Sequence, residues 1–389
     1  MIYISHNHPD HLHPETLSYF NKEKVVITGG FKSKSSEKML RTLKFDPLVL
    51  DFKDIYKVEN KNIFISIIKS GDFRDDSGLY LNINGYKIIL TVDSNHLNSG
   101  ILPKDIDLLA SSFASGASGF PLSFDNYDEL EKSKIIKRNR RADLSTTKQT
   151  ADLVNPKYYL PYAGYFNENC ERDSYIKENN LKNSPNDIIN VICNNSNIIG
   201  LNPMENDVFV FGNDKKLKSK SSLKSELAYN YNQNYFNKYV NSHKASFKIN
   251  DEEVLNYFNN CNYNDDLELY LNLTDDDFNS LGHSYLINFQ TGIFQIKSIK
   301  FLESQYKNPS NLKKLFISVR LEAFANIIIN KLPWEDFSIG FQCRIKRQPN
   351  LYNSKFWYYF TNVYIGAENY RYDANCGACN LINQSKKYI

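Results

Sequence analysis

Short apolar runs alternate with amphipathic stretches along the first half of the chain. Apolar runs bounded by turn residues predict strands, whereas apolar positions three to four residues apart predict helices. Strands are predicted at residues 2–4, 25–28, 47–52, 62–68, 79–83, 87–92, 108–113 and 155–166, and helices after Pro14 and Ser35. Two of these strands flank Asn84-Gly85, a pair typical of tight hairpins. The alternation of strands and helices predicts a layered α/β fold.

The second half of the chain has a different order of elements. Strands are predicted at residues 267–273, 284–289, 293–299 and 315–320, and the last strand runs into a helix at residues 321–330. This order predicts a small α+β domain and is similar to that of sterol-carrier-protein-like folds. A polar, lysine-rich stretch separates the two halves. We therefore divide the chain into residues 1–212, a linker at residues 213–226 and a C-terminal domain at residues 227–389.

Composition and charge narrow the classes of function. Of the 389 residues, 41% are hydrophobic and 14% are aromatic, which is enough for two hydrophobic cores. The formal net charge is +3, which gives no strong field to attract nucleic acid. The sequence shows neither a secretory leader nor an apolar run of the ~18–20 residues that span a membrane. We therefore expect a cytoplasmic protein that binds neither nucleic acid nor a membrane.

The first predicted strand leads into a loop that is rich in histidine. Four of the seven histidines lie between residues 6 and 13. His6 and His8 are two positions apart, so an extended backbone directs both side chains to one side. Asp10 and His11 follow, and imidazoles with a carboxylate suit zinc or iron. The alternatives are a solvated, histidine-rich terminus and the remnant of a tag, but tags are usually uninterrupted histidine runs.

The pattern His6-x-His8-x-Asp10-His11 resembles the metal loop of the metallo-β-lactamase superfamily. The resemblance implies that His6 and His8 serve one metal. It also implies that Asp10 and His11 serve a second metal and take part in catalysis. In this superfamily, an aspartate at the end of a strand bridges the two metals. Asp93 follows the strand at residues 87–92 and is the candidate for that bridge.

Two further residues near this predicted centre are weaker candidates. The superfamily usually places a third metal-binding histidine in the loop that corresponds to residues 70–78, where this chain has Asp72. A carboxylate can replace an imidazole at iron, so Asp72 is an additional candidate ligand. His96 follows Asp93 by three residues, and it either assists the centre or is an exposed loop histidine.

A run of small residues and an aromatic segment are candidates for binding the substrate. The small residues at 114–121 follow a strand, and they allow a backbone to approach a ligand or to wrap an anion. A flexible turn is the alternative. The aromatic side chains at residues 158–166 either line a pocket or pack in the core. The candidate substrate-binding residues are Ser115, Gly116, Ser118, Gly119, Tyr162 and Tyr165.

The six cysteines give little indication of a redox site. Only Cys376 and Cys379 have the spacing of a ligand pair, and a lone pair of this kind is weak support for a metal. The chain has no C-x-H…C-x-x-H pattern, so it holds no Rieske cluster of its own. Trp334 and Trp357, the only tryptophans, are expected to pack in cores rather than to stack on a substrate.

Several segments together resemble the CMP-N-acetylneuraminate monooxygenase (CMP-sialic acid hydroxylase) family. They are residues 6–17, residues 85–93, Gly116-Ala117-Ser118-Gly119-Phe120-Pro121, Pro161-Tyr162-Ala163-Gly164-Tyr165-Phe166, residues 175–178, Leu332-Pro333-Trp334-Glu335-Asp336 and Arg347-x-Pro349-Asn350-x-Tyr352-Asn353-x-x-Phe356-Trp357. The resemblance covers most of residues 1–205 and, less closely, the remainder. It implies a metallo-β-lactamase-like αββα sandwich followed by an α+β domain.

The resemblance also implies an activity. A member of this family is an iron-dependent oxygenase that hydroxylates the N-acetyl group of a CMP-linked sialic acid. Its electrons come from NADH through a Rieske centre and a ferredoxin or a cytochrome b5-type carrier. The expected partners of this chain are therefore a nucleotide-sugar substrate and an electron-transfer protein.

The chain departs from the family pattern at its start. The histidine loop begins at residue 6, so we expect the Rieske domain and the first strands of the sandwich to be missing and one sheet edge to be unpaired. The electron-transfer partner would then be a separate chain. Two alternatives stay open. The same loop with zinc would make a phosphodiesterase-like hydrolase, or the chain is an inactive, truncated homologue.

Overall fold

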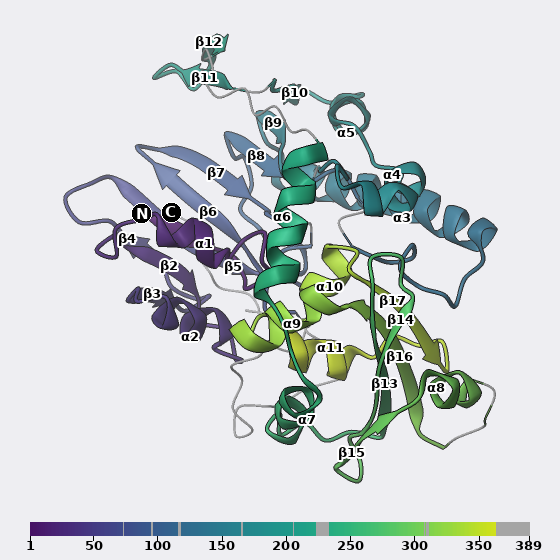
Figure 1. The fold of residues 1–389 in the computed structure, drawn as a ribbon. Coiled ribbons are helices and arrows are strands. Elements are labelled where there is room, and N and C mark those ends of the chain that lie inside the picture. The colour runs from purple at the N-terminus through teal and green to yellow at the C-terminus, as the bar shows by residue number, and fades with distance from the viewer. Residues whose placement is uncertain are drawn as a thin grey trace.

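The computed structural model describes residues 1–222 and 233–362, apart from residues 73, 95, 116–117, 165, 205, 307 and 309–310. The predicted ligand pair Cys376 and Cys379 lies outside the described residues. Figure 1 shows two parts next to each other. We call residues 1–222 the sandwich and residues 233–362 the C-terminal unit.

Two sheets form the centre of the sandwich. The smaller sheet has three parallel strands, in the order β1 (Ile2–Ile4), β2 (Val26–Gly29) and β3 (Pro47–Leu50). The larger sheet has seven strands in the order β10-β9-β8-β7-β6-β5-β4. Their bounds are β4 (Tyr56–Lys57), β5 (Ile63–Lys69), β6 (Ser77–Ile83), β7 (Tyr86–Leu90), β8 (Leu108–Ser111), β9 (Tyr158–Pro161) and β10 (Ile199–Gly200). Neighbouring strands from β4 to β7 are antiparallel, and those from β7 to β10 are parallel.

Apolar side chains pack between the two sheets, and helices cover their outer faces. Ile27 and Leu50 of the smaller sheet pack with Ile65, Ile67 and Leu79 of the larger one. The helices α1 (Pro14–Ser18) and α2 (Ser35–Thr42) pack on the smaller sheet, while α3 (Glu129–Val154) and α5 (Pro185–Cys193) pack on the larger sheet. The layers therefore run helix, sheet, sheet, helix, which is the predicted metallo-β-lactamase-like αββα sandwich.

Local sequence explains where the helices α3 and α5 begin. At the start of α3, the Asp128 side chain accepts a hydrogen bond from the Glu131 amide, and the Glu131 side chain accepts one from the Asp128 amide. Ser184 and Asp187 form the same reciprocal pair at α5. Each cap satisfies otherwise free amides and contributes about 1 kcal/mol. Two short helical segments, η2 (Glu171–Asp173) and α4 (Ser174–Asn179), lie between these helices.

The C-terminal unit is built around a five-stranded sheet in the order β15-β14-β13-β16-β17. Its strands are β13 (Leu267–Thr274), β14 (Ser280–Asn288), β15 (Ile293–Lys297), β16 (Lys313–Arg320) and β17 (Cys343–Gln348). Its helices are α6 (Gln233–Ser246), α7 (Asp251–Asn259), α8 (Ile299–Gln305), α9 (Leu321–Asn330), α10 (Glu335–Ile339) and α11 (Ser354–Thr361). The order of β13 to β16 and α9 is the one predicted from the sequence.

Trp334 lies at the centre of the core of the C-terminal unit. It is fully buried, and five phenylalanine rings surround it with centroids 4.7 to 5.9 Å away: Phe258, Phe324, Phe337, Phe356 and Phe360. Trp334 Nε1 donates a hydrogen bond to the Tyr257 hydroxyl over 2.8 Å. Aromatic pairs at these distances add to the effect of burial. The ring also fixes the start of α10, which carries Glu335 into the junction with the sandwich.

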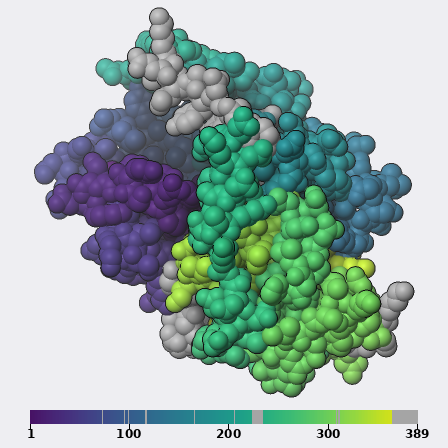
Figure 2. Space-filling model, in the orientation of Figure 1, coloured from purple at the N-terminus to yellow at the C-terminus, as the bar shows by residue number. Residues whose placement is uncertain are grey.

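The two parts interlock through a short stretch of backbone. Phe124 forms a parallel bridge with Ile345 of β17, and the Ser123 carbonyl accepts from the Ile345 amide at 2.7 Å. The Asp125 amide donates to the Ile345 carbonyl at 2.8 Å. The Phe124 side chain belongs to the core of the C-terminal unit. Figure 2 shows the two parts in close contact, with α6 running along the junction.

The stretch predicted as a linker is partly a strand. The structure forms a hairpin of β11 (Asp207–Phe211) and β12 (Leu217–Ser222), so the predicted linker begins inside its turn. Lys215 Nζ donates to the Gly85 carbonyl at 2.6 Å and to the Asp107 carboxylate at 2.8 Å, which attaches the hairpin to the sandwich. No described helix combines the length and apolar character that a membrane span requires.

Candidate metal centre

The histidine loop connects β1 to α1 at the edge of the smaller sheet. The His8 carbonyl accepts hydrogen bonds from the amides of His11 and Leu12, which makes the chain turn after Pro9. Leu12 is almost fully buried in the core against α1 and α2 and anchors the turn. The sequence folds this way because an apolar strand, a turn-forming Pro-Asp pair and a buried leucine follow one another.

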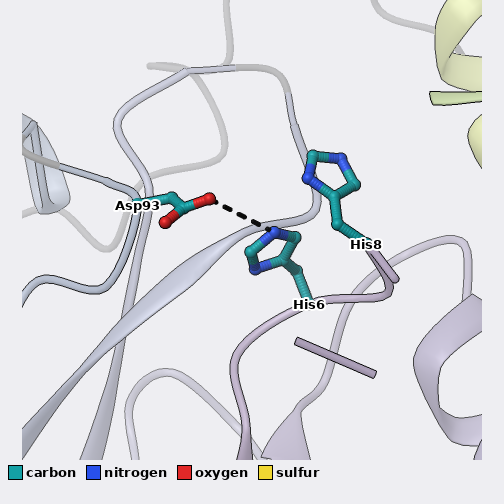
Figure 3. A group of neighbouring side chains, drawn as sticks. All are labelled: His6, His8 and Asp93. Carbon is teal, nitrogen blue, oxygen red and sulfur yellow. Dashed lines mark ion pairs between the residues drawn. The ribbon is translucent and has the colours of Figure 1, made fainter. Parts of the chain in front are cut away.

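The structure brings the predicted ligands together in two groups. One ligand atom from each of His6, His8 and Asp93 lies within 4.8 Å of the others (Figure 3). Asp10, His11 and Asp93 form a second group under the same limit. The rings of His6 and His11 are 4.3 Å apart, as are those of His6 and His8. Asp93 therefore belongs to both groups.

Asp76 orients the His6 ring. The Asp76 carboxylate lies 3.2 Å from His6 Nδ1, and Ser5 Oγ lies 2.9 Å from the same atom. A carboxylate at Nδ1 holds the proton there and leaves the lone pair on Nε2. Burial lowers the pKa of His6. The nearby His6 and Arg74 charges hold the pKa of Asp76 well below its usual range, although burial alone would raise it.

Glu335 plays a matching role for His8. Its carboxylate pairs with His8 Nε2, and both side chains are largely buried. Burial lowers the pKa of His8, but the Glu335, Asp76 and Asp10 carboxylates together raise it above its usual value. Glu335 is the first residue of α10, so the C-terminal unit supplies a partner for a residue at the start of the chain.

The second group depends on mutual contacts between its own members. His11 Nε2 lies 3.2 Å from Asp93 Oδ2 and 3.4 Å from Asp10 Oδ2. Burial opposes protonation, but the two carboxylates raise the pKa of His11 to about 10. Burial raises the pKa of Asp10, but the hydrogen bond and charge of His11 outweigh it and lower that pKa to about 2.

A strained turn positions Asp93 after β7. Val92, directly before it, has φ of +55°, a conformation that β-branched residues rarely adopt. The Tyr162 hydroxyl accepts a hydrogen bond from the Val92 amide at 3.0 Å and holds this turn. Tyr162, predicted to bind substrate, is thus placed behind Asp93 and not among the residues that line the cavity described below.

Other predicted residues occupy varied positions. Asp72 forms an ion pair with Arg74 at 2.6 Å and is in neither ligand group. His96 is exposed, and its carbonyl accepts from the Gly71 amide. Gly119 packs against Ser338, where a Cβ would come within 2.6 Å of the Ser338 carbonyl oxygen. Gly116 and Tyr165 lie outside the described residues.

A cavity of about 640 Å³ opens above the ligand groups. The sandwich contributes His8, Asp10, Asp93, Ser115, Ser118 and Gly164 to its wall, among others. The C-terminal unit contributes Glu335, Ser338, Ile339, Arg347, Tyr352 and Trp357. Phe120 and Phe124 from the interlocking stretch also line it. The volume lies in the range of small-molecule sites.

The donor set and one orphaned atom fit a metal at this position. His6 Nε2 is buried and has no hydrogen-bond partner among the described residues. Its nearest carboxylate oxygen, Asp93 Oδ2, is 3.9 Å away, beyond hydrogen-bond distance. A buried imidazole nitrogen without a partner is costly unless a ligand takes it up. Two nitrogens with a shared carboxylate suit zinc or iron, so the residues fit such an ion without selecting between the two metals.

Sequence reasoning missed both carboxylates that orient the histidines. Asp76 stands in the acidic loop at residues 70–78 beside Asp72 and Asp75, and the spacing alone did not distinguish them. Asp76 directly precedes β6, and this position brings it to His6. Glu335 carried a signal, because it lies in the Leu332–Asp336 segment noted for its resemblance, but no pattern linked it to His8.

Comparison with known proteins gives related sequences over nearly the whole chain. No family model matches. The cytidine monophosphate-N-acetylneuraminic acid hydroxylase of Sus scrofa is 30% identical over 387 residues, which cover 92% of this chain and 85% of that protein. The proteins of the same name from Macaca mulatta and Danio rerio are 31% and 30% identical over 386 residues. This chain spans 62% and 63% of their lengths.

Solved structures with similar coordinates cover about half of the chain. A protein described as a metal-dependent hydrolase, from Parabacteroides distasonis, has a TM-score of 0.33 at 15% identity and covers 51% of this chain and 74% of its own. A metallo-β-lactamase fold protein from Bacillus subtilis has a TM-score of 0.29 at 12% identity and covers 51% and 73%. The sequence relatives alone show the family: the chain belongs to the cytidine monophosphate-N-acetylneuraminic acid hydroxylase family.

Proposed function

We propose that the chain is the metal-binding part of an iron-dependent monooxygenase that hydroxylates the N-acetyl group of a CMP-sialic acid or a similar nucleotide sugar. The observation that carries the proposal is the pair of ligand groups that share Asp93 beneath a cavity of about 640 Å³. The name of the relatives supports the choice of substrate and reaction.

The residues that would hold the metals follow from the two groups. His6, His8 and Asp93 would hold one ion, and Asp10, His11 and Asp93 would hold the other. Iron bound there would supply the redox chemistry through which O₂ is activated. Asp72 is an outer residue in this proposal, because it pairs with Arg74.

The chain's own side chains orient the ligands and shield the site. Asp76 keeps a proton on His6 Nδ1, so His6 offers Nε2. Glu335 fixes the ring of His8. Phe120, Phe124 and Trp357 form an apolar part of the cavity wall and exclude water from a bound sugar.

The balance of the reaction requires an outside source of electrons. Converting a C–H bond and O₂ into C–OH and water consumes two electrons and two protons. We propose a Rieske protein, ferredoxin or cytochrome b5-type carrier as the electron donor, as the family resemblance implies.

Reconstitution tests this function directly. The purified chain would be loaded with Fe²⁺ and mixed with CMP-N-acetylneuraminate, O₂, NADH, and a Rieske or ferredoxin reductase system. Mass spectrometry should detect a product that is heavier by one oxygen atom, with the added oxygen on the N-acetyl group. The Asp93→Ala variant is the matched control and should give no product.

The other readings predict different results from the same preparation. A zinc-dependent hydrolase would bind zinc from a balanced medium and cleave a phosphodiester without a reductant. An inactive homologue would bind iron poorly and form neither product. Either result would overturn the monooxygenase proposal.

A further inference from the structure

Two buried polar groups on the cavity wall of the C-terminal unit lack part of their usual partners among the described residues: one has no counterion and the other has no hydrogen-bond acceptor. They are the guanidinium of Arg347, at the end of β17, and the indole N–H of Trp357, in α11. Sequence reasoning treated this segment only as a family resemblance and expected Trp357 to pack in a core. The wall therefore offers donors that the candidate metal centre does not use.

Arg347 is buried without a counterion. Arg347 is only 6% exposed. Its Nε and Nη2 donate to Asn350 Oδ1 at 3.2 and 3.1 Å, and Nη2 is 3.4 Å from the Tyr127 hydroxyl. Among the described residues, no carboxylate forms an ion pair with it. The other arginine of the wall, Arg74, is paired with Asp72. Buried arginines are rarely left without a negative partner.

The apolar side of the Arg347 guanidinium is also fixed. Its central carbon lies 4.8 Å above the Phe124 ring, within the range of cation–π contact. The Arg347 backbone is held by Asn126, which accepts from the amide and donates to the carbonyl at 2.8 Å each. The guanidinium is therefore preorganised on the cavity wall and needs no movement to receive an anion.

Trp357 is an independent observation of the same kind. The residue is 3% exposed, and its Nε1 is buried without a hydrogen-bond partner among the described residues. The other tryptophan, Trp334, has its Nε1 satisfied by Tyr257. An indole N–H is only a donor, and a buried one usually finds an acceptor. Trp357 lines the same cavity as Arg347, so both side chains belong to one wall.

We infer that Arg347 and Trp357 form a subsite that binds an oxyanion of the substrate inside the cavity. A nucleotide sugar of the proposed kind carries two such oxyanions, a phosphodiester and a carboxylate. The identity of this ligand rests on the proposed function, whereas the need for an acceptor comes from the two side chains.

Binding calorimetry on the metal-loaded chain tests the subsite. The probes are CMP, N-acetylneuraminate and CMP-N-acetylneuraminate. Arg347→Gln should weaken binding of the nucleotide sugar roughly 10- to 100-fold, the range for a lost charged hydrogen bond. Arg347→Lys keeps the charge without the planar fork and should restore part of that loss. A parallel loss for CMP assigns the phosphodiester to the subsite, and a parallel loss for N-acetylneuraminate assigns the carboxylate.

Two further variants separate binding from folding. Trp357→Phe keeps an aromatic ring but removes the donor, and it should weaken binding several-fold. Arg344→Gln is the matched control. Arg344 lies on the same strand and stacks on Phe278 at 4.0 Å, but it does not line the cavity. This control should bind all probes like the unaltered chain, and thermal melting identifies any variant that is unfolded.

Each outcome decides between the subsite and the proposed function. If the unaltered chain binds the nucleotide sugar and both Arg347→Gln and Trp357→Phe bind it equally well, the subsite is overturned and the proposed function stands. If the unaltered chain binds none of the three probes, the nucleotide-sugar function is overturned, and this ligand for the subsite with it.

Discussion

The two candidate ligand groups share Asp93, but the protein supports them differently. The first group places His6 in the interior and fixes both of its histidines with carboxylates from elsewhere, Asp76 for His6 and Glu335 for His8. The second group is more exposed, and the carboxylates that pair with its histidine, His11, are those of its own group, Asp10 and Asp93. The carboxylates of Asp76 and Glu335 hold the first group in place before a metal binds. In the second group, a metal must replace the ion pairs between His11 and the carboxylates of its own group.

Removing the shared residue should have the largest effect. Asp93→Ala removes a ligand from both groups, so we expect metal affinity to fall by more than roughly 100-fold. This exceeds the largest loss expected when a residue that only hydrogen-bonds a ligand is replaced. Titration with Zn²⁺ against a competing chelator would measure the affinity, and elemental analysis would measure the stoichiometry. If this variant retained one ion at unaltered affinity, Asp93 would not bridge the groups.

Breaking the outer support of the first group should have the next largest effect. Asp76→Asn removes the carboxylate from His6 Nδ1, so metal affinity of that group should fall roughly 10- to 100-fold while the second group is spared. Asp72→Asn is the matched control, because Asp72 lies in the same acidic loop but pairs with Arg74. Equal losses in the two variants would contradict the distinction between them.

The charge pairing in the second group predicts a pH dependence of the metal-free chain. The pKa of His11 is raised to about 10, so its stabilising charge is fully present below its unfolded value, about 6.5, and is lost as the pH rises through about 10. The free energy of unfolding should fall by at most a few kcal/mol across that window, since one pKa unit corresponds to about 1.4 kcal/mol.

Urea unfolding at several pH values would measure this slope. His11→Asn removes the titrating group and should flatten the slope between pH 6.5 and 10. His13→Asn changes a neighbouring histidine whose side chain hydrogen-bonds with Thr16, and it serves as the matched control. A slope that is the same in all three proteins would show that His11 is not the source.

The smallest effect should come from loosening the link between the first group and the C-terminal unit. Asn7 lies between His6 and His8, and its Nδ2 donates to the Thr361 carbonyl at 2.7 Å and to Ser35 Oγ at 3.0 Å. Asn7→Ala leaves buried partners unsatisfied, so the free energy of unfolding should fall by about 1–3 kcal/mol. Chemical denaturation measures the change. An effect on the metal affinity of the second group but not of the first would contradict this link.

Much of the layered fold, and the cluster of His6, His8 and His11, could be predicted from the sequence. Strand periodicity, the Asn84-Gly85 turn and the His6 to His11 spacing are local signals, and the structure has a strand, a hairpin and a ligand cluster at those places. The carboxylates around them were harder, because their roles depend on packing between distant segments. Asp76 and Asp72 lie in the same acidic loop, and only the path of the loop into β6 brings Asp76 rather than Asp72 to His6. Glu335 contacts His8 only once the C-terminal unit has folded.

The boundary between the parts was harder for the same reason. The composition near residues 213–226 suggested a linker. In the structure, however, Lys215 attaches this region to the sandwich, and Phe124 of the sandwich packs in the core of the C-terminal unit. Trp357 packs in the core of the C-terminal unit, as predicted from the sequence. Its unpartnered N–H is visible only when its surroundings are known.

The bridge between Phe124 and Ile345 limits how ligands can enter. A motion that separated the sandwich from the C-terminal unit as rigid bodies would break the hydrogen bonds of Ser123 and Asp125 with Ile345 and would expose Phe124 to water. Exposing one phenylalanine costs about 1.5–3 kcal/mol before the backbone bonds are counted. Opening by hinge is therefore unfavourable. Ligands should instead enter the cavity along its solvent-exposed rim, where Tyr352 is half exposed.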